Sequence, residues 1–310
     1  PLPSPSRGSE RPERGPSPRA APPDDLVSAP DLRAAAAAAP ERPPGPEPER
    51  LAAAVERAGD ELTSYTELKR RRRAARPADD VQVDDRVPVD RGEPEPSGDL
   101  PGGPRVGKCL HALLETVDRA QVAAGADAAT LGEDPAWLDR QLARFALQRE
   151  LGPPLAELVV RTLTRPLAFG DASPRRLADC EPFGREIDFL FSVPRAVGGD
   201  VFVRGFIDAL VGVDGDLWVL DYKSDILPSY APADLEAHVD RHYALQAELY
   251  GHAARAWLER VRPDLRLAGV AFHFSRAPLG TPGEGLCAFA VDALDLDGLL
   301  TRLGRPGGFA

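Results

Sequence analysis

The spacing of apolar residues changes once along this chain. From Val106 to Val117 they recur every three or four positions, which predicts an amphipathic helix, and the same spacing predicts helices over Ala136–Gln148 and Leu155–Thr164. Beyond these helices apolar and polar residues alternate, which is the pattern of a half-buried strand. The change of period predicts a helical region followed by a sheet.

Several strands are predicted in the second half, and a turn signal joins two of them. The predicted strands are Arg185–Val193, Val201–Val211, Leu217–Tyr222, Leu267–Ser275 and Cys287–Val291. Val213-Asp214-Gly215 connects the second strand to the third, and Asp-Gly between apolar runs predicts a hairpin. One long helix is predicted over Ala233–Arg260. Helices, a mixed sheet, a helix and a further strand describe an α/β domain.

Composition limits the class of protein. Residues 1–50 contain 14 of the 33 prolines and few aromatic or branched residues. We predict a disordered linker, because such a segment buries too little apolar surface to offset the conformational entropy that it would lose on folding. The net charge of −11 weighs against a stand-alone nucleic-acid binder, because cations supply most of the affinity for duplex DNA. The chain has no Met, no signal segment and no apolar run that could span a membrane. We therefore expect a cytoplasmic piece of a longer protein, without a membrane partner.

Residues 51–104 are predicted to be a helical connector and loop. Leu51–Ala58 has helical spacing, and Thr63–Ser64 can cap a second helix that runs into a basic cluster. Residues 76–104 are rich in Pro, Gly and acid, as expected for a loop. The compact domain is predicted at 105–305.

The cysteines, one basic run and one glycine-rich stretch each have an interpretation that involves no chemistry. Cys109, Cys180 and Cys287 are widely spaced and form no CxxC pair, so buried thiols are predicted rather than disulfides or a zinc site. The basic run Lys69–Arg73 fits either a solvated helix face or a DNA contact. The stretch 102–108 fits GxxxxGK, but Cys follows where Ser or Thr is needed and no apolar strand precedes it, so we expect no bound nucleotide.

The predicted hairpin carries the main candidate chemistry. Asp208 lies near the end of one strand, and Asp221 and Lys223 share one face of the next, where pairing can bring the two carboxylates close together. Hard oxygen ligands suit Mg²⁺ or Mn²⁺. Lys223 is one of only three lysines among 38 basic residues, which favours a specific need for an ammonium group. The alternative is a strand with ordinary polar residues.

Other candidates are weaker. Glu186 and Asp188 alternate with apolar residues, so either fits a ligand role or an exposed strand face. His111 lies beside the apolar stripe of its helix, where a histidine is more often structural than a ligand. Gln246 and Tyr250 are four residues apart and share a helix face, which fits either core packing or the orientation of a phosphate or lysine.

Three motifs in this order and spacing resemble the PD-(D/E)XK nuclease domain that ends the RecB subunits of bacterial exodeoxyribonuclease V. They are Gly205–Asp208, Asp221–Ser224 and Tyr243–Tyr250. Gly107-Lys108-Cys109-Leu110-His111 is similar to the family's N-terminal histidine motif, and Glu186 falls where the family keeps a strand glutamate. The resemblance covers roughly residues 60–290.

The resemblance implies a restriction-endonuclease-like mixed sheet flanked by helices, preceded here by the Pro-rich linker. It also implies a role for each candidate: His111, Asp208 and Asp221 bind the metal, Glu186 assists, Lys223 is the catalytic lysine, and Gln246 and Tyr250 complete the site. The implied cofactor is Mg²⁺, with Mn²⁺ as the alternative. Asp225 departs from the family, which commonly has asparagine after Lys-Ser.

The resemblance further implies a DNA exo- and endonuclease in double-strand break repair and recombination. Its expected partners are single-stranded DNA ends from unwound duplex, RecC- and RecD-like subunits, and a helicase portion of the same polypeptide. Three alternatives stay open: the equivalent domain of an AddA-type helicase–nuclease, a non-catalytic docking module for partner subunits, and a free-standing nuclease.

Overall fold

A computed structural model of the chain describes residues 60–74, 100–195, 198–279 and 285–305. The predicted linker at 1–50, the helix at Leu51–Ala58 and most of the loop at 76–104 lie outside the described residues. The strands are β1 (Glu61–Ser64), β2 (Pro166–Leu167), β3 (Arg175–Arg176), β4 (Glu181–Val193), β5 (Val201–Val213), β6 (Asp216–Lys223), β7 (Leu267–Phe274) and β8 (Leu286–Ala290). The α-helices are α3 (Tyr65–Ala74), α4 (Pro104–Thr116), α5 (Arg119–Ala123), α6 (Ala128–Gly132), α7 (Leu138–Arg144), α8 (Gly152–Thr164), α9 (Pro232–His242), α10 (Ala244–Val261) and α11 (Leu296–Gly304).

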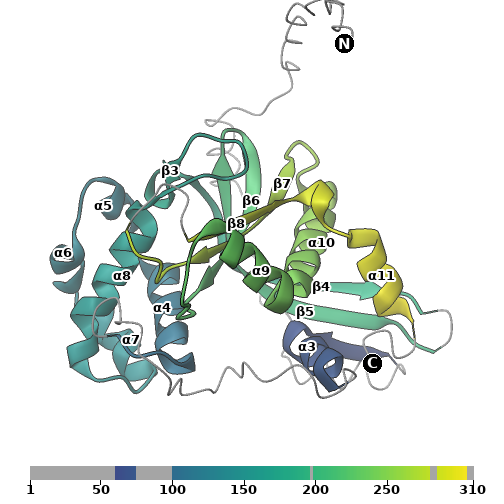
Figure 1. Cartoon of the computed structure of the whole chain (residues 1–310), viewed down its shortest axis with the longest axis horizontal. Helices are drawn as coiled ribbons and strands as arrows, with labels where there is room; N and C mark the ends of the chain where they lie inside the picture. Colours follow the sequence, from purple (N-terminus) through teal and green to yellow (C-terminus); the bar gives the residue numbers. More distant parts are fainter. Residues whose placement is uncertain (1–59, 75–99, 196–197, 280–284, 306–310) are drawn as a thin grey trace, which may run out of the picture.

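A mixed sheet lies at the centre of the domain (Figure 1). Its strands follow the order β1-β5-β6-β7-β8, and β4 also pairs with β5. β1 runs parallel to β5 and β6 parallel to β7, whereas the other pairs are antiparallel. The predicted hairpin joins β5 to β6 through Asp214 and Gly215, whose φ angles of 52° and 92° are those that a type I′ turn needs at both central residues.

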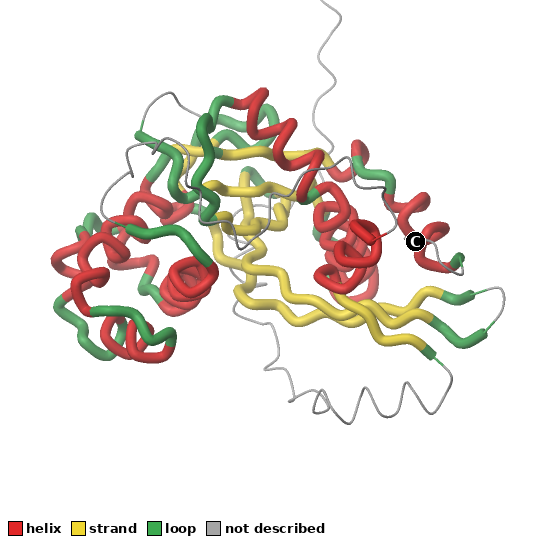
Figure 2. The backbone as a smooth tube through the Cα atoms, turned by 60° about the horizontal axis from the view of Figure 1, so that its bottom comes forward, coloured by secondary structure: helices red, strands yellow, loops and turns green. Residues whose placement is uncertain are grey.

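Helices cover both faces of this sheet (Figure 2). One core packs α4, α5 and α8 against residues of β5 and β6 that include Val211 and Leu220. The other core packs α3, α9, α10 and α11 against residues that include Val203, Val219 and Phe272. The predicted α/β class with helices flanking a mixed sheet is confirmed.

The predicted long helix at Ala233–Arg260 is wrong, because the chain breaks at Tyr243 into α9 and α10. Tyr243 leaves the helical conformation with φ −129° and ψ −1°. The Tyr65 hydroxyl donates to the carbonyl of His242 at 2.8 Å, and the Tyr243 hydroxyl donates to Asp225 Oδ1 at 2.8 Å. These tertiary hydrogen bonds stabilise the break, and apolar spacing alone does not register them.

Other boundaries shift by a few residues. The helix predicted at Ala136–Gln148 is shorter, as α7, and β4 begins four residues before the predicted Arg185. Two short helices, α5 and α6, were not predicted, and each is capped by an aspartate, Asp118 or Asp127. Residues 61–64 lie in the predicted helical connector but form strand β1 of the main sheet.

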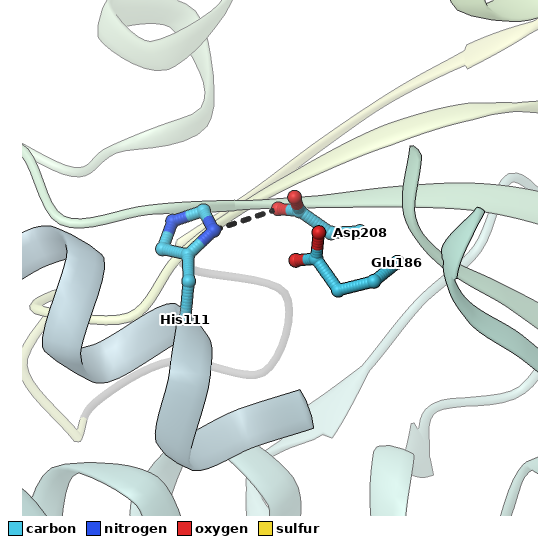
Figure 3. Close-up of side chains that lie close together, drawn as sticks. All are labelled: His111, Glu186 and Asp208. Atoms are coloured by element: carbon cyan, nitrogen blue, oxygen red, sulfur yellow. Dashed lines mark ion pairs between the residues drawn. The ribbon is translucent and has the colours of Figure 1, made fainter. Parts of the chain in front are cut away.

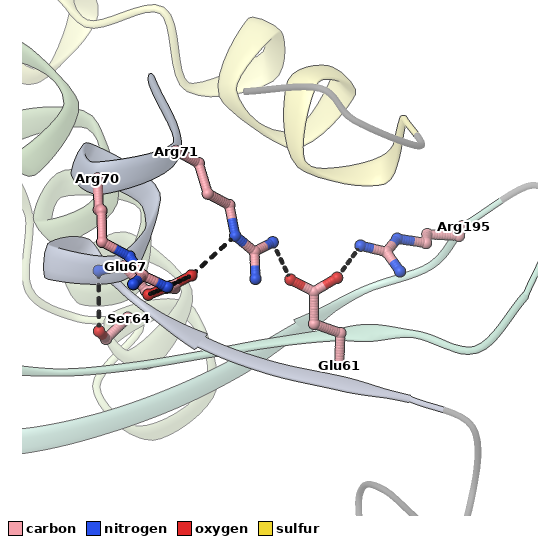
Figure 4. Close-up of polar contacts among 6 residues, drawn as sticks. All are labelled: Glu61, Ser64, Glu67, Arg70, Arg71 and Arg195. Carbon is pink, nitrogen blue, oxygen red and sulfur yellow. Dashed lines mark hydrogen bonds and ion pairs between the residues drawn. The ribbon is translucent and has the colours of Figure 1, made fainter. Parts of the chain in front are cut away.

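Two arginines of the basic run Lys69–Arg73 on α3 form ion pairs (Figure 4). Ser64 Oγ accepts from the N–H of Glu67 at 3.4 Å, which confirms the predicted cap. Arg70 and Arg71 pair with Glu67, and Arg71 also pairs with Glu61. Glu61 in turn pairs with Arg195, two residues after β4. Arg71 therefore links α3 to β1, and Arg195 links β1 to the segment that follows β4.

The cysteines behave as predicted. All three are buried and free, and burial raises the pKa of Cys109 to about 11 and that of Cys287 to about 12. They are therefore protonated thiols within the core at neutral pH. Among the described helices, none has both the length and the apolar character needed to cross a membrane.

Candidate active site

The β5–β6 hairpin brings three predicted site residues onto neighbouring strands. Asp208 lies on β5, and Asp221 and Lys223 lie near the end of β6. Asp221 and Lys223 both contact Gln246 of α10, whereas Tyr222 is buried in the core against α4. This alternation was predicted. The Tyr222 N–H also donates to Asp208 Oδ2 at 2.7 Å, which connects the two strands beside the carboxylates.

One histidine and two carboxylates from three elements converge next to this hairpin (Figure 3). His111 from α4, Glu186 from β4 and Asp208 from β5 each offer one ligand atom, and these atoms all lie within 4.8 Å of one another. His111 Nδ1 lies 3.2 Å from Asp208 Oδ2. No other set of three His, Cys, Asp or Glu side chains in the described residues meets this criterion. We call these three residues the metal triad.

The backbone of β4 is irregular at Glu186. Its φ of 45° lies in the left-handed region, which non-glycine residues rarely adopt. Residues two apart on a regular strand share a face of the sheet. On the partner strand β5, however, Ile207 is buried on the side of α10, and Ala209, two residues later, is buried on the side of α4. The paired strands therefore change face where Glu186 and Asp208 enter the site. Backbone strain of this kind costs about 1–3 kcal/mol and is concentrated at functional sites.

The charges of the triad are unbalanced. Burial lowers the pKa of His111, but the charge and hydrogen bond of Asp208 outweigh it and raise the pKa to about 8. Burial raises the pKa of Asp208, yet His111 and the Tyr222 N–H together bring it below its ordinary value. The pKa of Glu186 is raised by burial and by the charge of Asp208. A bound cation would relieve the repulsion between the two carboxylates.

The second group of predicted residues forms a connected network around Lys223. The Lys223 ammonium lies 2.6 Å from Asp221 Oδ2 and donates to Gln246 Oε1 at 2.9 Å. Gln246 Nε2 donates to Asp221 Oδ1 at 2.7 Å and to the Tyr250 hydroxyl at 2.9 Å. The Lys223 ammonium also lies 4.0 Å from the centre of the Tyr243 ring, a cation–π contact. We call Asp221, Lys223, Gln246 and Tyr250 the lysine network.

Burial sets the ionisation of this network. It raises the pKa of Asp221 to about 6, with Lys223 opposing and Asp208 reinforcing the shift. Burial also raises the pKa of Tyr250 well above its ordinary value, so the phenol stays protonated. The charge of Asp208 is thus felt by Asp221, and the triad and the network are electrostatically linked.

All seven predicted site residues therefore fall into two linked groups, although the division differs from the prediction. Glu186 lies with His111 and Asp208, whereas Asp221 lies with Lys223 and is outside the triad. The alternative acid Asp188 is directed elsewhere and pairs with Arg204, Nε to Oδ1 at 3.2 Å.

Several residues around the metal triad were not predicted. The triad lines a small pocket together with Leu114, Glu115, Arg119, Arg185, Ala209 and Tyr222. Glu115 stands one helical turn after His111 on α4, a spacing that could have indicated it. Arg119 and Arg185 had no distinguishing signal, because arginine supplies nearly all the positive charge of this chain.

The donor atoms of the triad fit a divalent metal ion. Carboxylate oxygens suit Mg²⁺ and Mn²⁺, and an imidazole nitrogen is a better ligand for Mn²⁺ than for Mg²⁺. The network supplies a lysine next to such a site. This combination of acids, a histidine and a lysine suits the hydrolysis of phosphate esters.

Comparisons with known proteins agree with this chemistry. A family model described as the PD-(D/E)XK nuclease superfamily matches residues 81–296. The RecBCD enzyme subunit RecB of Haemophilus influenzae is 28% identical over 214 residues, which cover 61% of this chain and 17% of the relative. RecB of Mycobacterium tuberculosis is 32% identical over 239 residues, covering 60% of this chain and 22% of the relative.

The matches therefore span less than a quarter of the length of these relatives. They confirm the resemblance to a RecB-type nuclease domain that the three motifs predicted. The family match covers more than half of the chain and includes the triad and the lysine network. With its mixed sheet, its acidic cluster and its adjacent lysine, this chain belongs to the PD-(D/E)XK nuclease superfamily.

Proposed function

We propose that this chain is the Mg²⁺-dependent DNA nuclease domain of a RecB-type helicase–nuclease. The observation that carries the proposal is the convergence of His111, Glu186 and Asp208 beside the network of Lys223. Neither group alone indicates a nuclease. Together they provide a cation site and a fixed ammonium group next to each other, on a fold that belongs to a nuclease superfamily.

We assign the metal to the triad, and Asp221 keeps its predicted role as a further ligand. A bound Mg²⁺ or Mn²⁺ would polarise the phosphate and neutralise developing charge. The Asp208 carboxylate is held for this role by the Tyr222 N–H and by His111. The strained backbone of Glu186 fixes a second carboxylate in the same place.

Lys223 is assigned to the stabilisation of charge on the reacting phosphate. Asp221 and Gln246 fix the position of its ammonium group, so little reorganisation is needed when charge develops. Tyr250 positions Gln246 through the hydrogen bond between their side chains. Gln246 and Tyr250 thus act through Lys223 and Asp221.

The wider role rests on the matched relatives, which are named as RecB subunits of the RecBCD enzyme. By this likeness we propose that the substrate is single-stranded DNA produced by unwinding, and that RecC- and RecD-like subunits and a helicase portion of the same polypeptide deliver it. The setting would be double-strand break repair and recombination in the bacterial cytoplasm. The acidic character of the chain, with net charge −11, is consistent with partners that hold the DNA.

The test is degradation of a labelled single-stranded DNA by the purified chain with Mg²⁺, with and without EDTA. Asp208→Asn removes a triad charge while keeping an oxygen that accepts from Tyr222. Asp188→Asn is the matched control, because Asp188 lies on the neighbouring strand and pairs with Arg204. We expect EDTA-sensitive cleavage by the wild type and by Asp188→Asn, and none by Asp208→Asn.

The alternatives give different results. Cleavage by Asp208→Asn at the wild-type rate would reject the assigned site. A folded wild type that binds metal and does not cleave, even when joined to a helicase portion, would indicate a docking module. An AddA-type assignment would keep the same chemistry with different partner subunits, and reconstitution with RecC-like subunits separates it from the RecB type.

A further inference from the structure

The pocket of the metal triad has a cationic side. Arg119, the first residue of α5, and Arg185, on β4, line this pocket together with His111, Glu186 and Asp208. The two arginines are close enough to interact, because the charge of Arg119 adds to burial in lowering the pKa of Arg185. The same pocket thus contains the candidate cation site and two guanidinium groups.

The two arginines differ in their hydrogen bonds. Arg185 Nη1 donates to the carbonyl oxygens of Glu115 at 2.5 Å and Val117 at 3.1 Å, so it has a structural role at the end of α4. Arg119 is only 6% exposed, and its Nε and Nη2 atoms are buried without a hydrogen-bond partner. Within the described residues no carboxylate forms an ion pair with Arg119.

An unpaired buried guanidinium is unfavourable for stability. Removing such a charge from water without a partner carries a penalty that a well-packed apolar side chain of similar size avoids. The charge of Arg119 therefore does not stabilise the folded protein in the absence of a ligand. Its position in the pocket calls for an anion that arrives from outside.

We propose that Arg119 binds a non-bridging oxygen of the DNA phosphate held at the metal triad, an inference that rests on the proposed nuclease function. A phosphate is the anion that this substrate brings to the pocket. The forked N–H groups of a guanidinium match phosphate oxygens, and a phosphate can be shared between a metal ion and an arginine, whereas the triad carboxylates are needed for the metal. Arg119 is then a substrate-binding residue and Arg185 supports the pocket wall.

The experiment measures binding of a labelled oligodeoxythymidine to the whole chain with Ca²⁺ in place of Mg²⁺, so that the triad is offered a cation that also takes oxygen ligands, at several salt concentrations. Recovery of the intact oligonucleotide is checked at each point. Arg119→Met keeps an unbranched side chain of similar length without the charge. Arg140→Met is the matched control, because Arg140 is exposed on α7 and does not line the pocket. Thermal unfolding without DNA is recorded for all variants.

For Arg119→Met we expect about tenfold weaker DNA binding, as for loss of one charged hydrogen-bonding group. The slope of log K against log salt should become shallower by about 0.7, the value for one phosphate contact on single-stranded DNA. The melting temperature should be unchanged or higher, which a merely structural role would not produce. Arg140→Met should match the wild type in all three measurements.

Unchanged affinity and salt slope in Arg119→Met would overturn the proposal, and so would a lower melting temperature with normal DNA binding. If Arg119→Met does not fold, Arg119→Lys decides: it keeps the charge without the fork, so binding weaker than wild type supports the proposal and wild-type binding overturns it. Absence of Mg²⁺-dependent cleavage in the wild type, also when it is joined to a helicase portion, would instead reject the nuclease function. Wild-type cleavage with no effect of Arg119 would reject this inference alone.

Discussion

The metal triad and the lysine network lie side by side, yet they are built in opposite ways. In the lysine network each charge has a partner: Lys223 faces Asp221, and Gln246 bonds to both. In the triad two carboxylates share one histidine, and the backbone at Glu186 is strained. The network is complete as the chain folds, whereas the triad has two carboxylates for one imidazole, a charge that a bound cation would balance. A mutation should therefore affect stability with opposite sign in the two groups.

The largest effect is expected from Lys223→Met. The variant leaves Asp221 buried without its partner, which should lower the free energy of unfolding by about 3–5 kcal/mol. The cleavage rate should fall about 100- to 1,000-fold. The double variant Asp221→Asn/Lys223→Met should recover much of the stability and none of the activity. Urea unfolding and a cleavage assay measure both, and a double variant no more stable than the single would contradict the pairing.

Glu186→Gln should change stability in the other direction. Without metal, loss of one of two clustered carboxylates should raise the free energy of unfolding by no more than about 1 kcal/mol, since a half-buried carboxylate near a like charge is disfavoured but solvent screens part of the repulsion. The rise in melting temperature on adding Mn²⁺ should be strongly reduced, because a ligand of the triad is lost. Calorimetry with and without Mn²⁺ checks this. A metal-free variant less stable than the wild type would show that Glu186 is a structural residue.

The pH dependence of the metal-free protein should follow His111. Its folded pKa of about 8 exceeds the ordinary 6.5, so its stabilising contribution is complete below pH 6.5 and is lost as the pH rises through 8. The free energy of unfolding should fall by about 1 kcal/mol over this range, and His111→Gln should remove the slope. Because protons compete for the ligand nitrogen, metal affinity should rise over the same range. An identical slope in His111→Gln would exclude this residue as its origin.

Asp221 gives the network its own pH signature. Its folded pKa of about 6 lies above the ordinary 3.8, so ionisation favours the unfolded chain, and the stability contributed falls between pH 4 and 6. The two groups thus titrate in separate windows. Asp221→Asn should flatten the lower window and move the upper one only slightly, toward lower pH, because the charge of Asp221 is a minor contribution to the raised pKa of His111. An effect of this variant only above pH 6.5 would contradict the assignment.

The smallest effect is expected in the ion-pair cluster of Figure 4. Glu61→Gln removes the pairs to Arg71 and Arg195, and partly exposed pairs of this kind contribute about 0.5–1 kcal/mol together. The cleavage rate should not change, because these residues do not line the pocket. A marked loss of cleavage would mean that β1 and α3 position the site, and would extend the comparison to a third region.

Much of the site could be predicted from local pattern. Strand alternation placed Asp221 and Lys223 on one face, and the Asp-Gly turn placed Asp208 on the neighbouring strand. These features depend on residues close together in the sequence. The position of each residue within the site could not be obtained in this way. The left-handed conformation of Glu186 turns the paired strands at one point, and spacing rules assume regular strands.

The other misses have the same origin in tertiary contacts. The break between α9 and α10 is stabilised by hydrogen bonds from the Tyr65 hydroxyl to the carbonyl of His242 and from the Tyr243 hydroxyl to Asp225. The helical spacing of apolar residues continues through the break, so it predicts one helix. Arg119 is distinguished only by where it is buried and by what it lacks. A sequence does not display the absence of a partner.

The most direct test of the central claim is the anomalous diffraction of a crystal of this protein grown with Mn²⁺. The account predicts a strong peak within coordination distance of His111, Glu186 and Asp208, next to the side chains of Asp221, Lys223 and Gln246. A peak at another position, or a triad that stays empty at Mn²⁺ concentrations that support cleavage, would contradict it.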